Sequence, residues 1–141
     1  MTNAKNTGQD PMPQTILVVD DSPTVVKFVA FSLKKGGFQV ITACDGMDAV
    51  EKISNHPGEV DMVITDLNMP NLDGYGLIST LRQNEKHKTT PIIILSSEAE
   101  EEDKERGLEV GANSYLVKPF KSAVLLSEVD RQLKQEANAV E

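Results

Sequence analysis

Four short apolar runs along the chain each end at a polar or charged residue. The runs cover residues 16–19, 62–65, 92–95 and 115–117. They are followed by Asp20 and Asp21, by Asp66, by Ser96 and by Lys118, respectively. Runs of this length, rich in Val and Ile, are typical of parallel strands buried on both faces. Because parallel strands end at the same edge of a sheet, we expect these polar residues to share one rim.

In the segments between these runs, apolar residues recur at the spacing of a helix. Ser22 can cap the first helix, Pro23 fits its first turn, and Gly36-Gly37 can end it. Asp73 can cap a later helix. The buried stripes predicted for four helices are Val26-Val29-Ala30-Leu33, Ala49-Val50-Ile53, Leu77-Ile78-Leu81 and Leu125-Leu126-Val129-Leu133.

A fifth helix differs because it is strongly acidic. Ser97 and Glu100 have the spacing of a capping box at its start. Only Ala99, Leu108 and Val110 offer it an apolar face, so we expect it to be the least firmly packed helix.

Five strands alternating with five helices predict an α/β fold, a doubly wound parallel sheet with helices on both faces. The run at 38–41 alternates apolar and polar residues as an edge strand does, which gives strand order 2-1-3-4-5. The first and third strands are then neighbours where the winding direction reverses. We expect one domain over residues 15–135, with an N-terminal tail of 1–14 and a C-terminal tail of 136–141.

Composition narrows the function. The 141 residues carry 22 acids and 14 bases, and a net charge of -8 argues against binding to nucleic acid or anionic lipid. No apolar stretch approaches the roughly 18–20 residues of a membrane span, and no signal peptide is recognisable, so we expect a cytoplasmic protein with protein partners. The single Cys44 excludes an internal disulfide and is expected to be a small buried hydrophobe.

The predicted rim crowds the carboxylates of Asp20, Asp21 and Asp66. A pair of like charges 4 Å apart costs about 4 kcal/mol at an effective dielectric near 20. A raised pKa, an ion pair with Lys118 or a hard cation would relieve this repulsion, and clustered oxygens favour Mg²⁺ or Mn²⁺. Asp66, after the central strand, is placed as a nucleophile that forms an aspartyl phosphate. Lys118 and the Ser96 hydroxyl would then contact phosphate oxygens.

Simpler explanations exist for each residue alone, because an Asp after a strand usually caps a helix and a Lys there is usually solvated. Their co-location favours the functional interpretation. An aspartate-based phosphohydrolase would carry a second aspartate where Asn68 stands, and a flavin or nucleotide module would need an anion-binding loop where Asp20-Asp21 stand. A phosphohistidine carrier would need a reactive histidine, but His56 and His87 are expected to be solvated loop residues.

Four motifs resemble the receiver domains of two-component response regulators, especially the single-domain chemotaxis (CheY-like) type with its flavodoxin-like fold. The resemblance covers about residues 15–135. Its motifs are Val19-Asp20-Asp21-Ser22, Asp66-Leu67-Asn68-Met69-Pro70-Asn71-Leu72-Asp73-Gly74, Leu95-Ser96-Ser97 and Lys118-Pro119-Phe120.

This resemblance implies that Asp66 accepts a phosphoryl group from a histidine kinase or phosphotransfer protein. Asp21, Asp66 and the Asn68 carbonyl would bind the metal, and Asp20 would assist through water. Lys118 would bind the phosphate, with a cis bond before Pro119. The protein would then be a signalling protein rather than an enzyme, with Mg²⁺-dependent self-phosphorylation and autodephosphorylation only.

The resemblance also implies a switch. Ser96 would be drawn towards the phosphoryl group, and Tyr115 would rotate inward, unless Tyr115 is simply a half-buried edge residue. The acidic helix, the strand at 115–117 and the last helix would form the partner face. Asn68 and Glu98 match the pairing of chemotaxis members, in which the phosphoryl group is short-lived.

No output domain follows residue 135, so we expect a stand-alone messenger to a downstream target protein or a phosphorelay intermediate. The protein is expected to be a monomer, and dimerisation on activation is left open.

Overall fold

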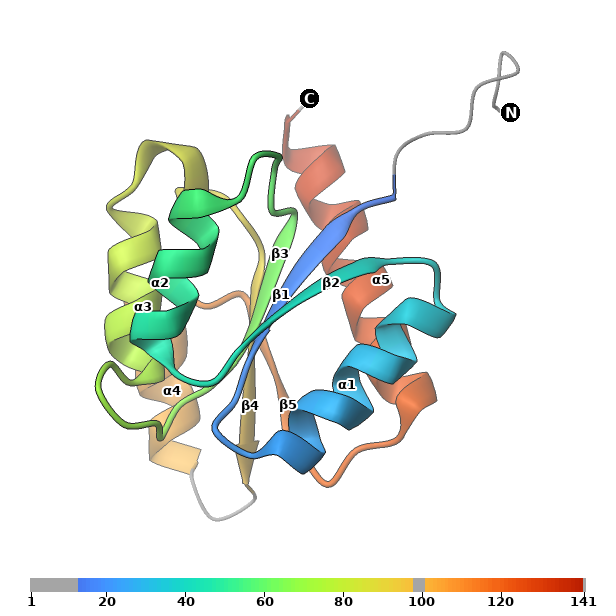
Figure 1. Ribbon diagram of the computed structural model, residues 1–141, viewed down its shortest axis with the longest axis horizontal. Helices are drawn as coiled ribbons and strands as arrows, with labels where there is room; N and C mark the ends of the chain where they lie inside the picture. The colour runs from blue at the N-terminus through green and yellow to red at the C-terminus, as the bar shows by residue number, and fades with distance from the viewer. Residues whose placement is uncertain (1–12, 98–100, 141) are drawn as a thin grey trace.

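The computed structural model describes residues 13–97 and 101–140 and contains a five-stranded sheet between two helical layers (Figure 1). The strands are β1 (Thr15–Val19), β2 (Gln39–Ala43), β3 (Met62–Asp66), β4 (Ile92–Ser97) and β5 (Ser114–Lys118). The helices are α1 (Pro23–Lys35), α2 (Gly46–Asn55), α3 (Gly74–Arg82), α4 (Glu101–Val110) and α5 (Ser122–Val140), with a 3-10 turn η1 (Glu85–His87). All neighbouring strands are parallel in the order β2-β1-β3-β4-β5, so the predicted fold is confirmed.

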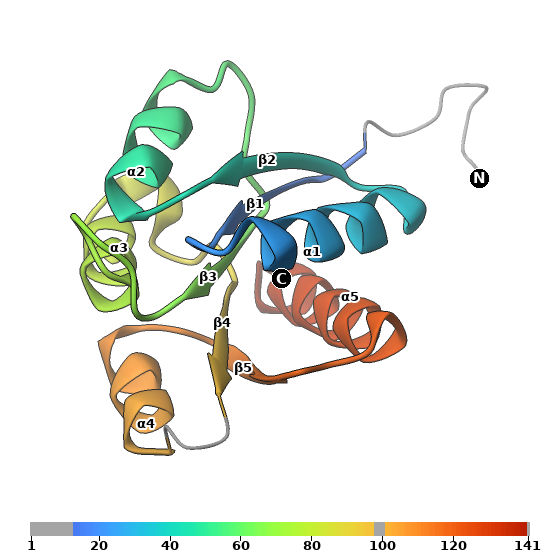
Figure 2. The same ribbon diagram turned by 60° about the horizontal axis from the view of Figure 1, so that its bottom comes forward.

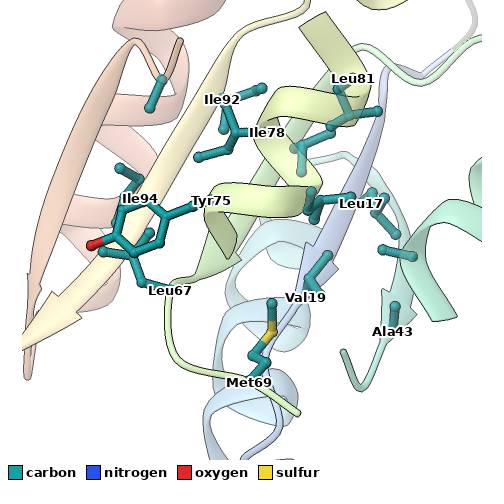
Figure 3. Packing of buried hydrophobic residues seen from close by; sticks show 14 of the residues in the cluster. Leu17, Val19, Ala43, Leu67, Met69, Tyr75, Ile78, Leu81, Ile92 and Ile94 are labelled. Atoms are coloured by element: carbon teal, nitrogen blue, oxygen red, sulfur yellow. The ribbon is translucent and has the colours of Figure 1, made fainter. Parts of the chain in front are cut away.

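Apolar cores on both faces fix the three central strands. In Figure 2, α1 and α5 cover one face of the sheet, and α2, α3 and α4 cover the other. Side chains of β1 alternate between the two cores: Leu17 and Val19 face the α2–α3 side, whereas Ile16 and Val18 face the α1–α5 side. Figure 3 shows the first of these cores. Burial on both faces explains why the sequence of this strand has no polar alternation.

Predicted caps begin two helices. The Ser22 hydroxyl accepts a hydrogen bond from the Val25 amide at 3.4 Å, and Asp73 accepts one from Gly76 at 2.9 Å. The sequence analysis missed the third cap, Asp45, whose side chain accepts from the Asp48 amide at the start of α2. The predicted capping box of the acidic helix includes Glu100, which lies outside the described residues.

Three predictions about single residues are wrong. Cys44 is exposed rather than buried, because it lies beyond the end of the edge strand β2. His87 is buried rather than solvated, with Nδ1 3.2 Å from the Thr90 hydroxyl. Leu108 is exposed rather than part of a buried face of α4. The last helix, α5, continues through Val140, and the domain boundary at residue 135 stays a prediction.

Arg82 ties three segments together at the amino rim of the sheet. Its guanidinium donates to the carbonyls of Gly111 and His87 at 3.0 and 2.8 Å and to the Asn113 side chain at 2.9 Å. Asn113 also accepts from the Ile92 amide at 2.8 Å. The end of α3, the start of β4 and the carboxyl end of α4 are therefore held to one another.

Within the part of the chain that the structure describes, no helix is long and apolar enough to cross a membrane.

Gly74 touches the backbone beneath the carboxyl rim, which predicts a cost for any side chain there. A Cβ at Gly74 would collide with the Asp66 carbonyl oxygen and lie 2.8 Å from Leu67 Cα. We expect Gly74→Ala to lower the free energy of unfolding by about 3 kcal/mol, because backbone atoms cannot move aside cheaply. Gly58→Ala, whose Cβ would lie 3.7 Å from the nearest heavy atom, is the control in urea denaturation. Equal effects would contradict the packing assignment.

His87 predicts a pH dependence of stability. Burial, with the positive charges of Lys86 and Arg82, lowers the pKa of His87 below its ordinary 6.5. The unfolded chain therefore gains a proton first as the pH falls through 6.5, so the free energy of unfolding decreases, by at most about 1.4 kcal/mol per pH unit. Urea denaturation across this window should show a flatter profile for His87→Gln, with His56→Gln as the matched control. An unaltered slope in His87→Gln would contradict the prediction.

Candidate functional site

Three carboxylates meet at the carboxyl rim of the sheet, as the sequence predicted. Asp20 and Asp21 follow β1, and Asp66 ends the adjacent strand β3. One carboxylate oxygen of each lies within 4.8 Å of those of the other two. Asp20 is buried, Asp66 is partly buried and Asp21 is exposed. The cluster is thus accessible from one side and enclosed on the other.

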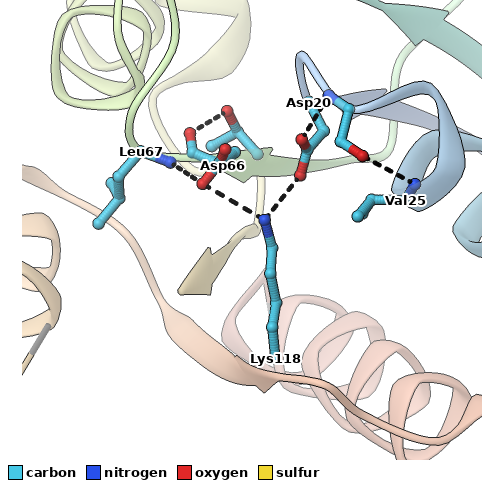
Figure 4. Close-up of polar contacts among 7 residues, drawn as sticks. Asp20, Val25, Asp66, Leu67 and Lys118 are labelled. Carbon is cyan, nitrogen blue, oxygen red and sulfur yellow. Dashed lines mark hydrogen bonds and ion pairs between the residues drawn. The ribbon is translucent and has the colours of Figure 1, made fainter. Parts of the chain in front are cut away.

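Lys118 reaches this cluster from the edge strand β5. Its Nζ lies 3.1 Å from Asp20 Oδ2 and 3.7 Å from Asp66 Oδ1 (Figure 4). The second oxygen of Asp20 accepts from the Ser22 amide at 2.9 Å. The peptide bond between Lys118 and Pro119 is cis, as the sequence analysis predicted. One ammonium therefore bridges two of the three carboxylates.

The negative charge of the Asp66 carboxylate is electrostatically unfavourable in the folded protein. Its Oδ1 accepts from the Leu67 amide at 2.8 Å. Burial and the neighbouring charge of Asp20 nevertheless raise the pKa of Asp66 above 3.8, and the attraction of Lys118 offsets this only in part. A cation or a cationic ligand at the cluster would lower the electrostatic cost.

Ser96 supplies a second unsatisfied group. Asp66 pairs with Leu95 across β3 and β4, so Ser96 lies one step further along towards the same rim. Its side chain is 1% exposed, and its hydroxyl has no hydrogen-bond partner among the described residues. Buried hydroxyls usually find a partner, so this one fits a site that gains an acceptor when a ligand binds.

A hollow of about 220 Å³ opens beside the cluster. Its walls come from the end of β2, from the segments that follow β1 and β2, and from α1 and α2. The lining residues are Asp20, Asp21, Pro23, Val26, Thr42, Ala43, Cys44, Asp48 and Lys52. This space is large enough for several waters or a small anion. The donor set of the three carboxylates consists of oxygens, which fits Mg²⁺ or Mn²⁺.

Asn71 and Asp45 support the loop that follows Asp66, and the sequence analysis missed both. Asn71 has a positive φ of 70°, a conformation that Asn tolerates better than most residues. Its amide donates to Asp45 Oδ2 at 2.7 Å. The only sequence signal was an Asn within a Pro- and Asp-containing turn, which does not identify its partner.

Of the remaining predicted residues, Asn68 lies exposed in the same loop. Tyr115 is 38% exposed on β5, and Lys104 Nζ lies 4.6 Å from the centre of its ring. Glu98 lies outside the described residues. The roles predicted for these three residues therefore stay predictions.

The raised pKa of Asp66 predicts that its charge destabilises the metal-free fold. The folded protein holds this proton more tightly than the unfolded chain, so the cost is present at neutral pH and disappears as the pH falls through 3.8. We expect Asp66→Asn to raise the free energy of unfolding by about 1 kcal/mol near pH 7 with EDTA. Urea denaturation measures this, with the exposed Asp130→Asn as control. A less stable Asp66→Asn protein would refute the charge-crowding interpretation.

Several known proteins are similar to this chain in sequence and in fold. Protein PilG of Pseudomonas aeruginosa is 42% identical over 115 residues, which are 81% of this chain and 83% of PilG. The chemotaxis response regulator CheY4 of Vibrio cholerae superposes with a TM-score of 0.80 at 36% identity, covering 86% of this chain and 99% of CheY4. Some relatives are longer: the chain covers 49% of Response regulator GtcR of Aneurinibacillus migulanus, at 36% identity.

The receiver domain of sensor histidine kinase PA1611 from Pseudomonas aeruginosa PAO1 was solved with a magnesium ion coordinated in its active site cleft. It is 33% identical, with a TM-score of 0.79 over 87% of this chain and 99% of that domain. Residues 16–130 match the response regulator receiver domain, a family of phosphoacceptor signalling proteins that bind Mg²⁺ at an acidic pocket. The chain belongs to the response regulator receiver domain family.

Proposed function

We propose that this protein is a response regulator that accepts a phosphoryl group on Asp66 and signals by binding a partner protein. The observation that carries the proposal is the cluster of three carboxylates within 4.8 Å, two of them bridged by Lys118. The donor would be a phosphohistidine of a kinase or phosphotransfer protein. The net charge of -8 favours a protein partner over nucleic acid or membrane.

Asp21, Asp66 and the Asn68 carbonyl would hold Mg²⁺, with Asp20 assisting through water. When bound, the ion supplies positive charge that neutralises the transferring phosphoryl group. The crowded oxygens and the raised pKa of Asp66 support this assignment, because both make a divalent cation favourable at the cluster. PA1611, with magnesium in the corresponding kind of cleft, supports it further.

Each side chain then has a defined part in phosphoryl transfer. A carboxylate oxygen of Asp66 forms a bond to phosphorus as the phosphorus–nitrogen bond of the donor histidine breaks, and the electron pair stays on the imidazole nitrogen. Lys118 exchanges a carboxylate contact for a phosphoryl oxygen, and the Ser96 hydroxyl gains the acceptor that it lacks. Attack of water on phosphorus later releases phosphate and restores the Asp66 carboxylate. Asn68 and Glu98 are proposed to keep this lifetime short.

The switch is proposed to run from Ser96 to Tyr115. Movement of Ser96 towards the phosphoryl oxygens vacates space beneath α4, into which the half-exposed ring of Tyr115 rotates. The surface of α4, β5 and α5 would change as a result and bind a downstream target. The same protein would serve as a phosphorelay intermediate if its phosphoryl group passes to another histidine.

Acetyl phosphate labelled with ³²P tests the assignment of Asp66. We expect Mg²⁺-dependent labelling of the wild type, loss of more than about 99% of the label in Asp66→Asn, and wild-type labelling in Asp130→Asn, because only Asp66 supplies the nucleophile. Stable label on Asp66→Asn would contradict the assignment. Multiple turnover of unrelated phosphate esters would indicate the phosphohydrolase instead.

A comparison of phosphorylated and unmodified protein separates the two signalling roles. Retention of a target only by the phosphorylated form indicates a messenger, whereas transfer of ³²P to a histidine protein indicates a relay intermediate.

A further inference from the structure

Helix α4 is attached to the domain by polar and small residues. Within its described side chains, residues 102–110, only Lys104 and Gly107 are buried. Gly107 allows the helix to approach the sheet closely, since a Cβ there would collide with Ile94 Cδ1. Leu108 is 41% exposed. Few apolar contacts therefore hold this helix, and other contacts must define its position.

Two cations of α4 lie over aromatic rings on opposite sides. The Arg106 guanidinium carbon lies 4.1 Å from the centre of the Tyr75 ring on α3, and the Tyr75 hydroxyl donates to the Asp103 carbonyl at 3.2 Å. On the side of β5, Lys104 Nζ lies 4.6 Å from the centre of the Tyr115 ring. Both distances are within the range of cation–π attraction, about 6 Å. These contacts attach α4 to α3 and to β5.

Of the two contacts between a lysine and an aromatic ring among the described residues, the one made by Lys104 is the more buried. Lys104 is 7% exposed, whereas Lys35, whose Nζ lies 5.6 Å from the centre of the Phe31 ring, is exposed together with that ring. A cation–π contact strengthens when water is excluded. The face of the Tyr115 ring thus has a partly desolvated ammonium against it.

We propose that Lys104 and Tyr115 form a cation–π latch that holds the Tyr115 ring partly exposed and α4 in its resting position. This inference rests on the switch role proposed above for Tyr115. Inward rotation of the ring takes its face away from Lys104, so the latch stabilises only the unphosphorylated state. The contact between Arg106 and Tyr75 does not involve the moving ring, so α4 stays attached to α3 during the change.

A contact present in one state only must bias the equilibrium between the two states. Removing the latch therefore populates the inward ring orientation without phosphorylation. Because linkage is reciprocal, it also favours phosphorylation of Asp66 to the extent that phosphorylation favours the inward ring.

Fluorine NMR of protein labelled with 3-fluorotyrosine measures the ring directly. The chain has two tyrosines and no tryptophan, so Tyr115→Phe assigns the resonance of Tyr115. In unphosphorylated Lys104→Met, we expect this resonance to move towards the position that wild type takes with acetyl phosphate and Mg²⁺. The shift should correspond to a three- to tenfold rise in the inward-to-outward ratio, roughly the loss of one cation–π contact. Lys104→Arg should keep the wild-type position, and Lys35→Met controls for the lost charge.

The latch is refuted if the Tyr115 resonance has the same position in Lys104→Met as in Lys35→Met. That result would leave the assignment of Asp66 as phosphoacceptor intact, because ³²P labelling tests it separately. If phosphorylation of the wild type does not move the resonance, the switch role of Tyr115 fails together with the latch. Circular dichroism melting verifies that each variant folds. Lys104→Gln, a second neutral substitution, takes the place of Lys104→Met if that variant does not unfold cooperatively, and must show the same displacement.

Discussion

Repulsion among three carboxylates is the constraint around which the carboxyl rim is organised. Adjacent parallel strands place Asp20, Asp21 and Asp66 together, and buried apolar cores on both faces of β1 and β3 prevent them from moving apart. Lys118 and the Ser22 amide satisfy Asp20, but a single ammonium leaves the cluster negative. Burial, and after it the neighbouring charge of Asp20, raise the pKa of Asp66, in keeping with this imbalance. A divalent cation would correct it by adding positive charge, and the proposed phosphoryl group would give Lys118 and Ser96 an acceptor.

The rest of the domain divides into a fixed part and an adaptable part. The central strands and α3 are fixed by fully buried Ile, Leu and Val side chains. In contrast, α4 is held by Gly107, by the partly buried Val110 and by two cations over aromatic rings, the last of which are contacts of modest energy. Leu67 links the two parts, because it directly follows Asp66 and its side chain lies near Gly107 and Gly74. Leu67 therefore connects Asp66 to α4 by direct packing.

The sheet and its carboxyl rim could be predicted because both follow from local patterns in the sequence. Apolar runs define buried strands, and a polar residue directly after such a run lies at the carboxyl rim of the sheet. Asp66, Ser96 and Lys118 could therefore be placed without coordinates. The packing of α4 could not be predicted in this way. Its sequence offers only Ala99, Leu108 and Val110 as an apolar face, but in the structure Leu108 is exposed and Lys104 is buried. The cause is a ring on β5, whose position relative to Lys104 is set by tertiary structure.

His87 and Cys44 show the same limit on a smaller scale. His87 lies in a polar stretch that indicates a solvated loop, yet Arg82 binds its carbonyl and Thr90 its ring, and both contacts come from the surrounding turn and helix. Cys44 follows a strand-like run, but that strand is at the edge of the sheet and ends one residue earlier. Local pattern identifies an element, whereas burial at its ends depends on which neighbours cover it.

The contacts of Arg82 determine which end of α4 would move in the proposed switch. They hold Gly111 and Asn113, just beyond the carboxyl end of the helix, to α3, while the opposite end faces the rim that contains Ser96. In the switch proposed above, α4 would then swing about its carboxyl end, and its displacement would increase along the helix towards Glu101. For a ten-residue helix of about 15 Å, a tilt of roughly 10° moves the amino end by about 2.6 Å while the tied end hardly shifts. A partner that recognises the first turn of α4 would therefore discriminate between the two states better than one that recognises its last.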